Sequence, residues 1–236
     1  MYFPSSTPPP ILIGIQKPGN LCHSLVNARE LDGLRRNPAI IRIAGHASAS
    51  FATWAPKLYT YHEDHFDVVL NHDHSLQRNF TNSVWAATTI NFGPRTITRK
   101  HRDYSNLPFG WCAVTALGNF DATKGGQLAL CSLKRFVDLP SGRTALFPSA
   151  AVAHGNTPIA KHEQRYSITQ YTAGGIFRWA EQGCQPSNAY MEGLGEIELE
   201  MEVKLMAERC KLGLSLYSTL ESIDVDLEAR RLATSS

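Results

Sequence analysis

The stretch RTITRKHRDYSNLPFGWCAVTAL, residues 95–117, holds two short β-rich runs on either side of a turn-forming segment. The first run ends with His101 and Asp103, two positions apart. Side chains at positions i and i+2 of a strand point to the same face. If the first run is a strand, both side chains point into one cavity and are a candidate metal-ligand pair. A surface turn is the plainer alternative.

The β-rich texture extends on both sides of this stretch, from about residue 84 to residue 179. Gly, Pro, Asn and Asp separate the runs, and short strands at such spacing are typical of a β sandwich or barrel. The runs are VWAATTINF (84–92), RTITRKHRD (95–103), GWCAVTAL (110–117), GQLALCSL (126–133), RTALFPS (143–149) and RYSITQY (165–171).

Helical patterns flank the β-rich region. Residues 23–37 and 55–78 have the spacing of apolar residues that is typical of helices. A third helix is expected near residues 193–220. Its apolar residues form a stripe that we expect to cover the β core, with binding to a partner as the alternative. The stripe consists of Leu199, Val203, Met206 and Cys210.

These patterns predict an α+β protein with a β core and flanking helices. Residues 1–20 are Pro-rich and are expected to form an extended lead-in. Residues 21–236 are expected to form one domain. Its parts are a helical segment (21–80), the β core (about 84–179) and a C-terminal helix (about 193–220).

Composition excludes several classes of protein. With 236 residues, of which 43% are hydrophobic, the chain is long enough for a substantial core. Its net charge of +2 does not by itself indicate a nucleic-acid partner. No apolar run approaches the length of a membrane span, so no membrane association is expected. The five cysteines form no CxxC pair, which argues against a disulfide framework or a cysteine-based zinc site and fits a reducing compartment.

A wider constellation strengthens the case for a metal site. His154 lies 51 residues beyond Asp103, and Arg165 follows His154 by 11 residues. Two histidines and one carboxylate form the facial triad that holds non-haem Fe(II) and leaves coordination positions open. The guanidinium of Arg165 suits the far carboxylate of a dicarboxylic acid, and Ser167, on the same strand face, can donate a second hydrogen bond.

The pattern H-x-D…H…R-x-S resembles the Fe(II)/2-oxoglutarate dioxygenases over about residues 84–179. The resemblance implies a double-stranded β-helix, or jelly roll, as the core. It also implies that His101, Asp103 and His154 bind Fe(II) and that Arg165 binds 2-oxoglutarate, with O₂ as the second cosubstrate. Asn91 and Arg99 are further candidates for contacts to 2-oxoglutarate, with a solvated surface as the alternative for each.

Within that family, HRDYSN followed by an apolar strand resembles the TET/JBP branch, which oxidises methylated bases in DNA. The resemblance implies that Asn106 contacts the target base and that Tyr171 stacks on it. A histidine that the branch uses for the base is replaced here by Ala173. Asp121 is a candidate for the missing polar contact, although an ordinary turn residue is the better interpretation of it.

Four histidines between residues 62 and 74 make a second possible metal cluster. They are interleaved with Glu and Asp and have no cysteine nearby, so a solvated, charged helix face is the expected arrangement. The residues are His62, His65, His72 and His74.

The expected function is therefore oxidation of a methyl group on a flipped base of duplex DNA. The base is 5-methylcytosine, with N6-methyladenine also open. One alternative is a 2-oxoglutarate-dependent hydroxylase of a protein or small molecule. Another is a module that binds DNA or protein without catalysis. A nuclear location follows only from the proposed substrate, and the oligomeric state stays open.

Overall fold

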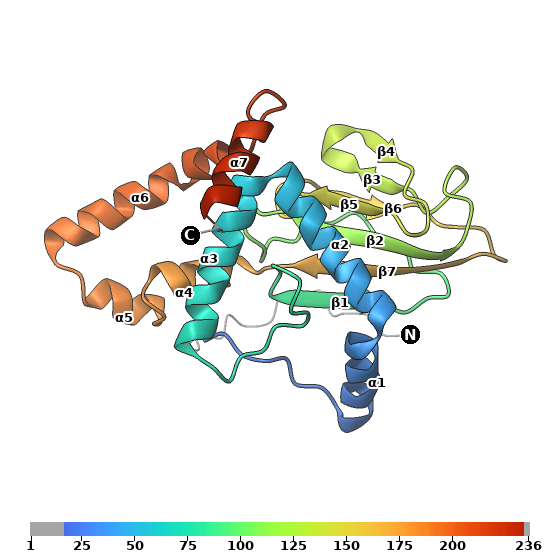
Figure 1. Cartoon of the computed structure of the whole chain (residues 1–236), viewed down its shortest axis with the longest axis horizontal. Helices are drawn as coiled ribbons and strands as arrows, with labels where there is room; N and C mark the ends of the chain where they lie inside the picture. Colours follow the sequence, from blue (N-terminus) through green and yellow to red (C-terminus); the bar gives the residue numbers. More distant parts are fainter. Residues whose placement is uncertain (1–16, 234–236) are drawn as a thin grey trace.

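The computed structural model describes residues 17–233 (Figure 1). Most of the predicted lead-in lies outside the described residues, and residues 17–20 form neither helix nor strand. The helices are α1 (Leu25–Arg36), α2 (Pro38–Trp54), α3 (Pro56–His72), α4 (Gly174–Glu181), α5 (Ser187–Glu192), α6 (Glu196–Ser215) and α7 (Ile223–Ala233), with a 3-10 turn, η1 (Cys131–Leu133). The strands are β1 (Ala87–Asn91), β2 (Cys112–Asn119), β3 (Leu128–Leu130), β4 (Arg135–Val137), β5 (Thr144–Phe147), β6 (His154–Asn156) and β7 (Gln164–Tyr171).

The strands form two antiparallel sheets. One sheet has the order β1-β7-β2-β5 and the other β4-β3-β6. Side chains from both sheets line one cavity between them. The structure thus confirms the predicted α+β class with a jelly-roll type of core. It also adds β4 and β6, two three-residue strands that the sequence patterns did not predict.

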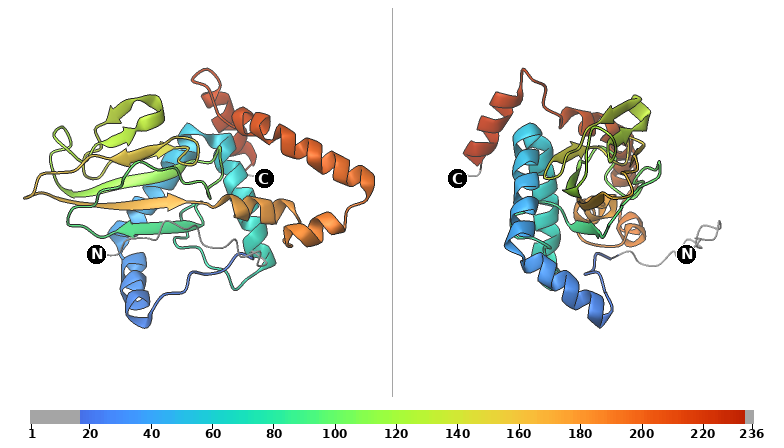
Figure 2. Two further views of the ribbon diagram at one scale, coloured as in Figure 1. Left: turned by 180° about the vertical axis from the view of Figure 1, so that it is seen from behind. Right: turned by 90° about the vertical axis from the view of Figure 1, so that its right-hand side faces the viewer.

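Helices α2 and α3 lie on one side of the larger sheet, as the right-hand view of Figure 2 shows, and α1 extends past the β1 edge. The predicted helices at 23–37 and 55–78 correspond to α1 and α3, while α2 was not predicted. The side chain of Asn37 accepts a hydrogen bond from the backbone of Ala39, and Pro38 occupies the first turn of α2. Small buried residues on α2 let Phe51 stack on Trp85, which ties this helix to the β core.

The predicted strand 95–103 is not a regular strand. Only single bridges form, between Arg95 and Arg165 and between His101 and His154. Between them the side chain of Asn156 accepts a hydrogen bond from the backbone N–H of Thr98, where a strand would use a backbone carbonyl. The segment therefore pairs with β7 of one sheet at Arg95 and with β6 of the other sheet at His101, and it forms no regular strand between these points.

His62 corrects the expectation of a solvated histidine face. His72 and His74 are exposed, but the His62 side chain is fully buried. It lies edge-on to the rings of Phe51 and Phe177. Neither of its ring nitrogens has a hydrogen-bond partner within the described chain. Burial lowers the pKa of His62 to about 3, so this imidazole is neutral.

This burial predicts a specific acid sensitivity. The unfolded chain takes up a proton at His62 below pH about 6.5, whereas the folded chain does not, so stability is lost as pH falls from about 6.5 towards 3. The expected loss from this group is about 1.4 kcal/mol per pH unit. Urea unfolding of the native protein and of His62→Leu, between pH about 7.5 and 5, measures it. As the pH falls, the free energy of unfolding of the variant should rise relative to that of the native protein by about this amount per pH unit. A difference between the two proteins that does not depend on pH would contradict the prediction.

The C-terminal region also differs from expectation. The predicted helix 193–220 corresponds to α6, but α4, α5 and α7 accompany it. The stripe that was expected to cover the β core is exposed, with Leu199 at 39% and Val203 at 58%. Figure 1 shows the reason, since α5 and α6 form an arm that stands off the body of the molecule and away from the sheets.

Two further expectations concern the whole chain. All five cysteines are free thiols. Within residues 17–233, no helix is both long enough and apolar enough to cross a membrane.

Candidate functional site

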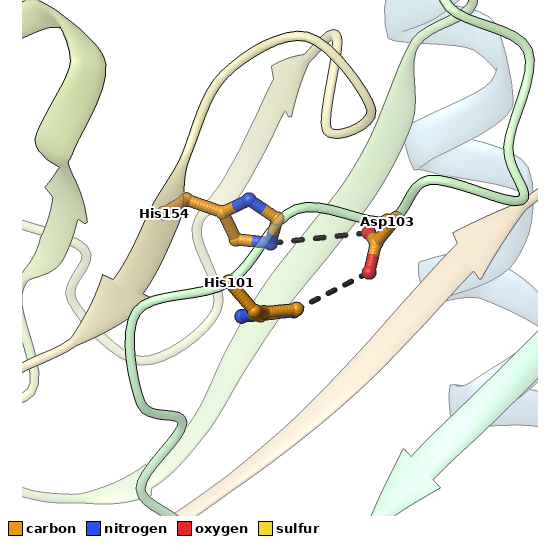
Figure 3. A group of neighbouring side chains, drawn as sticks. All are labelled: His101, Asp103 and His154. Carbon is orange, nitrogen blue, oxygen red and sulfur yellow. Dashed lines mark ion pairs between the residues drawn. The ribbon is translucent and has the colours of Figure 1, made fainter. Parts of the chain in front are cut away.

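A cluster of two histidines and one aspartate lies between the two sheets (Figure 3). His101 and His154 are cross-strand neighbours, because each backbone N–H donates to the carbonyl of the other at 2.9 Å. Asp103 Oδ1 lies 3.3 Å from His101 Nε2, and Asp103 Oδ2 lies 3.9 Å from His154 Nε2. One potential ligand atom from each residue lies within 4.8 Å of the others. The structure thus brings the three predicted metal ligands together.

Backbone carbonyls orient both imidazole rings. His101 Nδ1 lies 2.9 Å from the carbonyl oxygen of Arg99, and His154 Nδ1 lies 2.9 Å from that of Val152. A carbonyl can only accept, so Nδ1 carries a proton in each ring, and in the neutral imidazole the lone pair is then on Nε2, which faces the cluster. Burial lowers the pKa of His154, which favours the neutral ring that a metal requires.

The donor set fits a non-haem Fe(II) ion. Two imidazole nitrogens and one carboxylate oxygen are the ligands of the facial triad, and they leave the remaining coordination positions open. Among the residues that the structure describes, no other group of His, Cys, Asp and Glu brings ligand atoms together in this way.

The cluster opens on a cavity of about 310 Å³ between the sheets. This volume is in the range of small-molecule sites. Four alternate residues of β7 line it, as the two-residue period of a strand predicts. The lining consists of Thr89, Asn91, Thr98, His101, Asp103, Ser105, Asn106, Val114, Leu128, His154, Gly155, Asn156, Arg165, Ser167, Thr169 and Tyr171.

Arg165 places a buried positive charge in this cavity. The residue is 3% exposed, and its Nη1 donates to Thr96 Oγ1 at 3.1 Å. Its Nε has no hydrogen-bond partner, and no carboxylate of residues 17–233 forms an ion pair with it. Burial lowers its pKa, although a guanidinium stays charged. A buried cation without a counter-ion among the described residues can pair with an anionic group of a ligand.

Ser167 lies beside Arg165 on the same face of β7. Its Oγ accepts a hydrogen bond of 2.9 Å from Asn91 Nδ2, and Asn91 pairs with Ser167 across β1 and β7. The hydroxyl proton of Ser167 is therefore free to point at a ligand in the cavity.

Asn106 and Tyr171 both line the same cavity. Asn106 is buried, its Nδ2 donates to Ser149 Oγ at 3.2 Å, and its backbone bridges to Ala173. The hydroxyl of Tyr171 lies 3.3 Å from Thr89 Oγ1.

Two predicted site residues lie elsewhere. Asp121 does not line the cavity, because its carboxylate accepts from the backbone and hydroxyl of Thr123 and pairs with Lys124 at 2.9 Å. It is the turn residue of an exposed loop. The side chain of Arg99 is exposed and also lies outside the cavity lining, while its carbonyl orients His101.

Sequence reasoning missed several residues of the site. Thr89 lies two positions before Asn91 on β1, so strand periodicity could have identified it. Asn156 lies two positions after His154, but on β6, a strand that the sequence patterns did not predict. Thr96 and Ser149 come from irregular segments, where no periodicity marks them.

No protein-family model matches this sequence, and no curated protein matches it. Among solved structures, it is similar to NgTET1 in complex with 5mC DNA, at 20% identity and a TM-score of 0.37, over 45% of this chain and 42% of that one. It is also similar to the viral collagen prolyl hydroxylase vCPH from Paramecium Bursaria Chlorella virus-1 in its 2OG complex. That likeness has 12% identity and a TM-score of 0.27, over 43% of this chain and 64% of that one. The chain thus spans less than two thirds of each of these proteins.

Proposed function

We propose that this protein is an Fe(II)- and 2-oxoglutarate-dependent dioxygenase that oxidises the methyl group of a methylated base in DNA. One observation carries the proposal. A single cavity holds both the His–Asp–His cluster and the buried guanidinium of Arg165, which has no counter-ion among the described residues. Such an oxygenase needs both features in one place, because the metal and the cosubstrate must meet.

The roles of the residues follow from their contacts. His101, Asp103 and His154 would hold Fe(II). Arg165 would bind the far carboxylate of 2-oxoglutarate through its planar fork, and the hydroxyl of Ser167 would donate to the same carboxylate. Bound Fe(II), with 2-oxoglutarate and O₂, supplies oxidation of a C–H bond coupled to decarboxylation of 2-oxoglutarate to succinate and CO₂.

The substrate end of the cavity is assigned to Asn106 and Tyr171. A base stacked in duplex DNA cannot reach the cavity, so it must flip out, at a cost of a few kcal/mol. Stacking on the ring of Tyr171 would offset part of that cost, and the Asn106 amide would contact the edge of the base. The proposed base is 5-methylcytosine. Because Ala173 offers no polar contact, N6-methyladenine is the second candidate.

One turnover experiment tests the proposal. The protein is mixed without oxygen with Fe(II), 2-oxoglutarate and duplex DNA that carries 5-methylcytosine, N6-methyladenine or neither, and air is then added. Mass spectrometry quantifies modified nucleosides and succinate. An oxidised base from one DNA alone would support the proposal and identify the base. Succinate without any altered base would indicate that the substrate is a protein or a small molecule. The absence of succinate would refute the proposal.

Replacing Asn106 or Tyr171 by alanine should separate base oxidation from cosubstrate turnover. Loss of one stacking or hydrogen-bonding contact of about 1–3 kcal/mol should lower base oxidation about 5- to 150-fold. Succinate formed without DNA should change by less than about threefold, because the residues proposed to bind iron and cosubstrate are intact. Phe136→Ala, an exposed aromatic on β4, is the control. A parallel fall of both products would contradict the assignment of this end of the cavity.

A further inference from the structure

Helix α6 carries an unusual amount of exposed apolar surface. Eight of its large apolar side chains are at least 39% exposed, and Ile197 reaches 76%. The eight are Ile197, Leu199, Met201, Val203, Leu205, Met206, Leu212 and Leu214. Exposed apolar surface of this extent on one element marks an interaction site.

One face of α6 holds it to the rest of the chain. Glu202 and Gly213 are the two buried residues of the helix. Arg209 Nη2 donates to Glu181 Oε2 at 2.6 Å, and Gly213 packs so closely on the ring of Phe109 that a side chain would collide with it. Residues 202, 209 and 213 are spaced by seven and four positions, so these anchors share one side of the helix. The remaining faces are left for a partner.

An apolar row runs along α6 beside the anchored side, interrupted once by Glu208 between Leu205 and Leu212. Ile197, Met201 and Leu205 follow one another at intervals of four, and Leu212 continues the row two turns later. The stripe is close to symmetric about Leu205, because Ile197 lies eight residues before it and Leu212 seven residues after it. A second antiparallel copy of the helix centred on Leu205 would therefore place Leu212 one residue from the position opposite Ile197 at both ends.

The charges of α6 select the partner. Residues 196–203 contain four glutamates and no basic residue, whereas residues 204–215 contain three basic residues and one glutamate. Five glutamates against three basic residues leave the helix with a net charge of −2, which disfavours DNA and anionic membranes. An antiparallel copy brings the acidic half against the basic half. With Leu205 at the centre, Glu200 lies one residue from the position opposite Lys211.

From this surface we infer that the protein forms a two-fold symmetric homodimer in which the two α6 helices pack antiparallel through the stripe Ile197, Met201, Leu205 and Leu212. Such an interface uses the same patch on both copies, as closed dimers do. Figure 1 shows α6 on the far side of α3 from the two sheets that line the cavity.

The first test is the mass in solution. Sedimentation of the full chain at about 20 µM should give twice the chain mass of 26.1 kDa. Leu205→Glu should raise the dimer dissociation constant at least about 100-fold, because two carboxylates would meet at the two-fold axis. Leu133→Glu is a matched control, since Leu133 and Leu205 are both 57% exposed, and it should remain dimeric. A monomeric native protein, or a dimer that Leu205→Glu leaves intact, would overturn the inference.

A charge exchange tests the antiparallel register. Glu200→Lys and Lys211→Glu should each weaken the dimer, because each places like charges across the interface twice. An equal mixture of the two single variants should form heterodimers, and the double variant should regain the homodimer. Dimers that respond to Leu205→Glu but show no such rescue would overturn the antiparallel arrangement.

Discussion

Replacing Asp103 by alanine should abolish cosubstrate turnover, a loss of at least about 1,000-fold in succinate formation. The carboxylate faces both imidazoles, with Oδ1 at 3.3 Å from His101 Nε2 and Oδ2 at 3.9 Å from His154 Nε2. It is the one anionic member of the cluster. Without it, two neutral imidazoles would remain to hold a divalent ion. Iron content of protein purified without oxygen should fall from about one ion per chain to near zero.

Asp121→Ala is the matched control for this change. It removes an aspartate carboxylate from an exposed loop outside the cavity. That carboxylate accepts a hydrogen bond from Thr123 and forms an ion pair with Lys124. Turnover and iron content of this variant should stay at native levels. Native turnover by Asp103→Ala, with iron carry-over excluded, would show that the cluster is not the metal centre.

The sequence predicted the parts of the site that strand periodicity governs. Arg165, Ser167 and Tyr171 share a face because β7 is a regular, paired strand, and a period of two is reliable there. The same argument succeeded only by chance for His101 and Asp103. Their segment is irregular, and the backbone bridge from His101 to His154, together with the bond from the Asp103 N–H to Ser149, places them.

Long-range packing explains the errors. Small buried residues such as Ala44 and Ala47 give α2 its core face, and such residues make a weak apolar pattern. The burial of His62 depends on aromatic rings from α2 and α4, which no local pattern reveals. In α6, apolar and charged residues alternate over residues 197–205, so the apolar residues spread around the helix and cannot all face the core.

Replacing Arg165 by methionine should raise the KM for 2-oxoglutarate about 100- to 4,000-fold. Removing one partner of a buried charge pair costs about 3–5 kcal/mol, and each 1.4 kcal/mol is a factor of ten. Only the KM for 2-oxoglutarate should rise, and the KM values for the other substrates should stay at native levels. Arg99→Met is the control, because it removes the same charge from an exposed side chain outside the cavity, and its KM should be unchanged. An unchanged KM for Arg165→Met would place the cosubstrate carboxylate elsewhere.

Thermal unfolding distinguishes this role from a purely structural one. Without ligand, Arg165 is a buried cation with an unpartnered Nε, and its Nη1 bonds to the neutral Thr96 hydroxyl. Methionine retains most of the apolar stem without the buried charge, so Arg165→Met should unfold at the native Tm or above it. Native protein with 2-oxoglutarate at about 100 times its Kd should gain about 2.7 kcal/mol of stability. The variant should gain almost none at that concentration. A variant that is destabilised without ligand yet still stabilised by it would show that Arg165 supports the fold and not the cosubstrate.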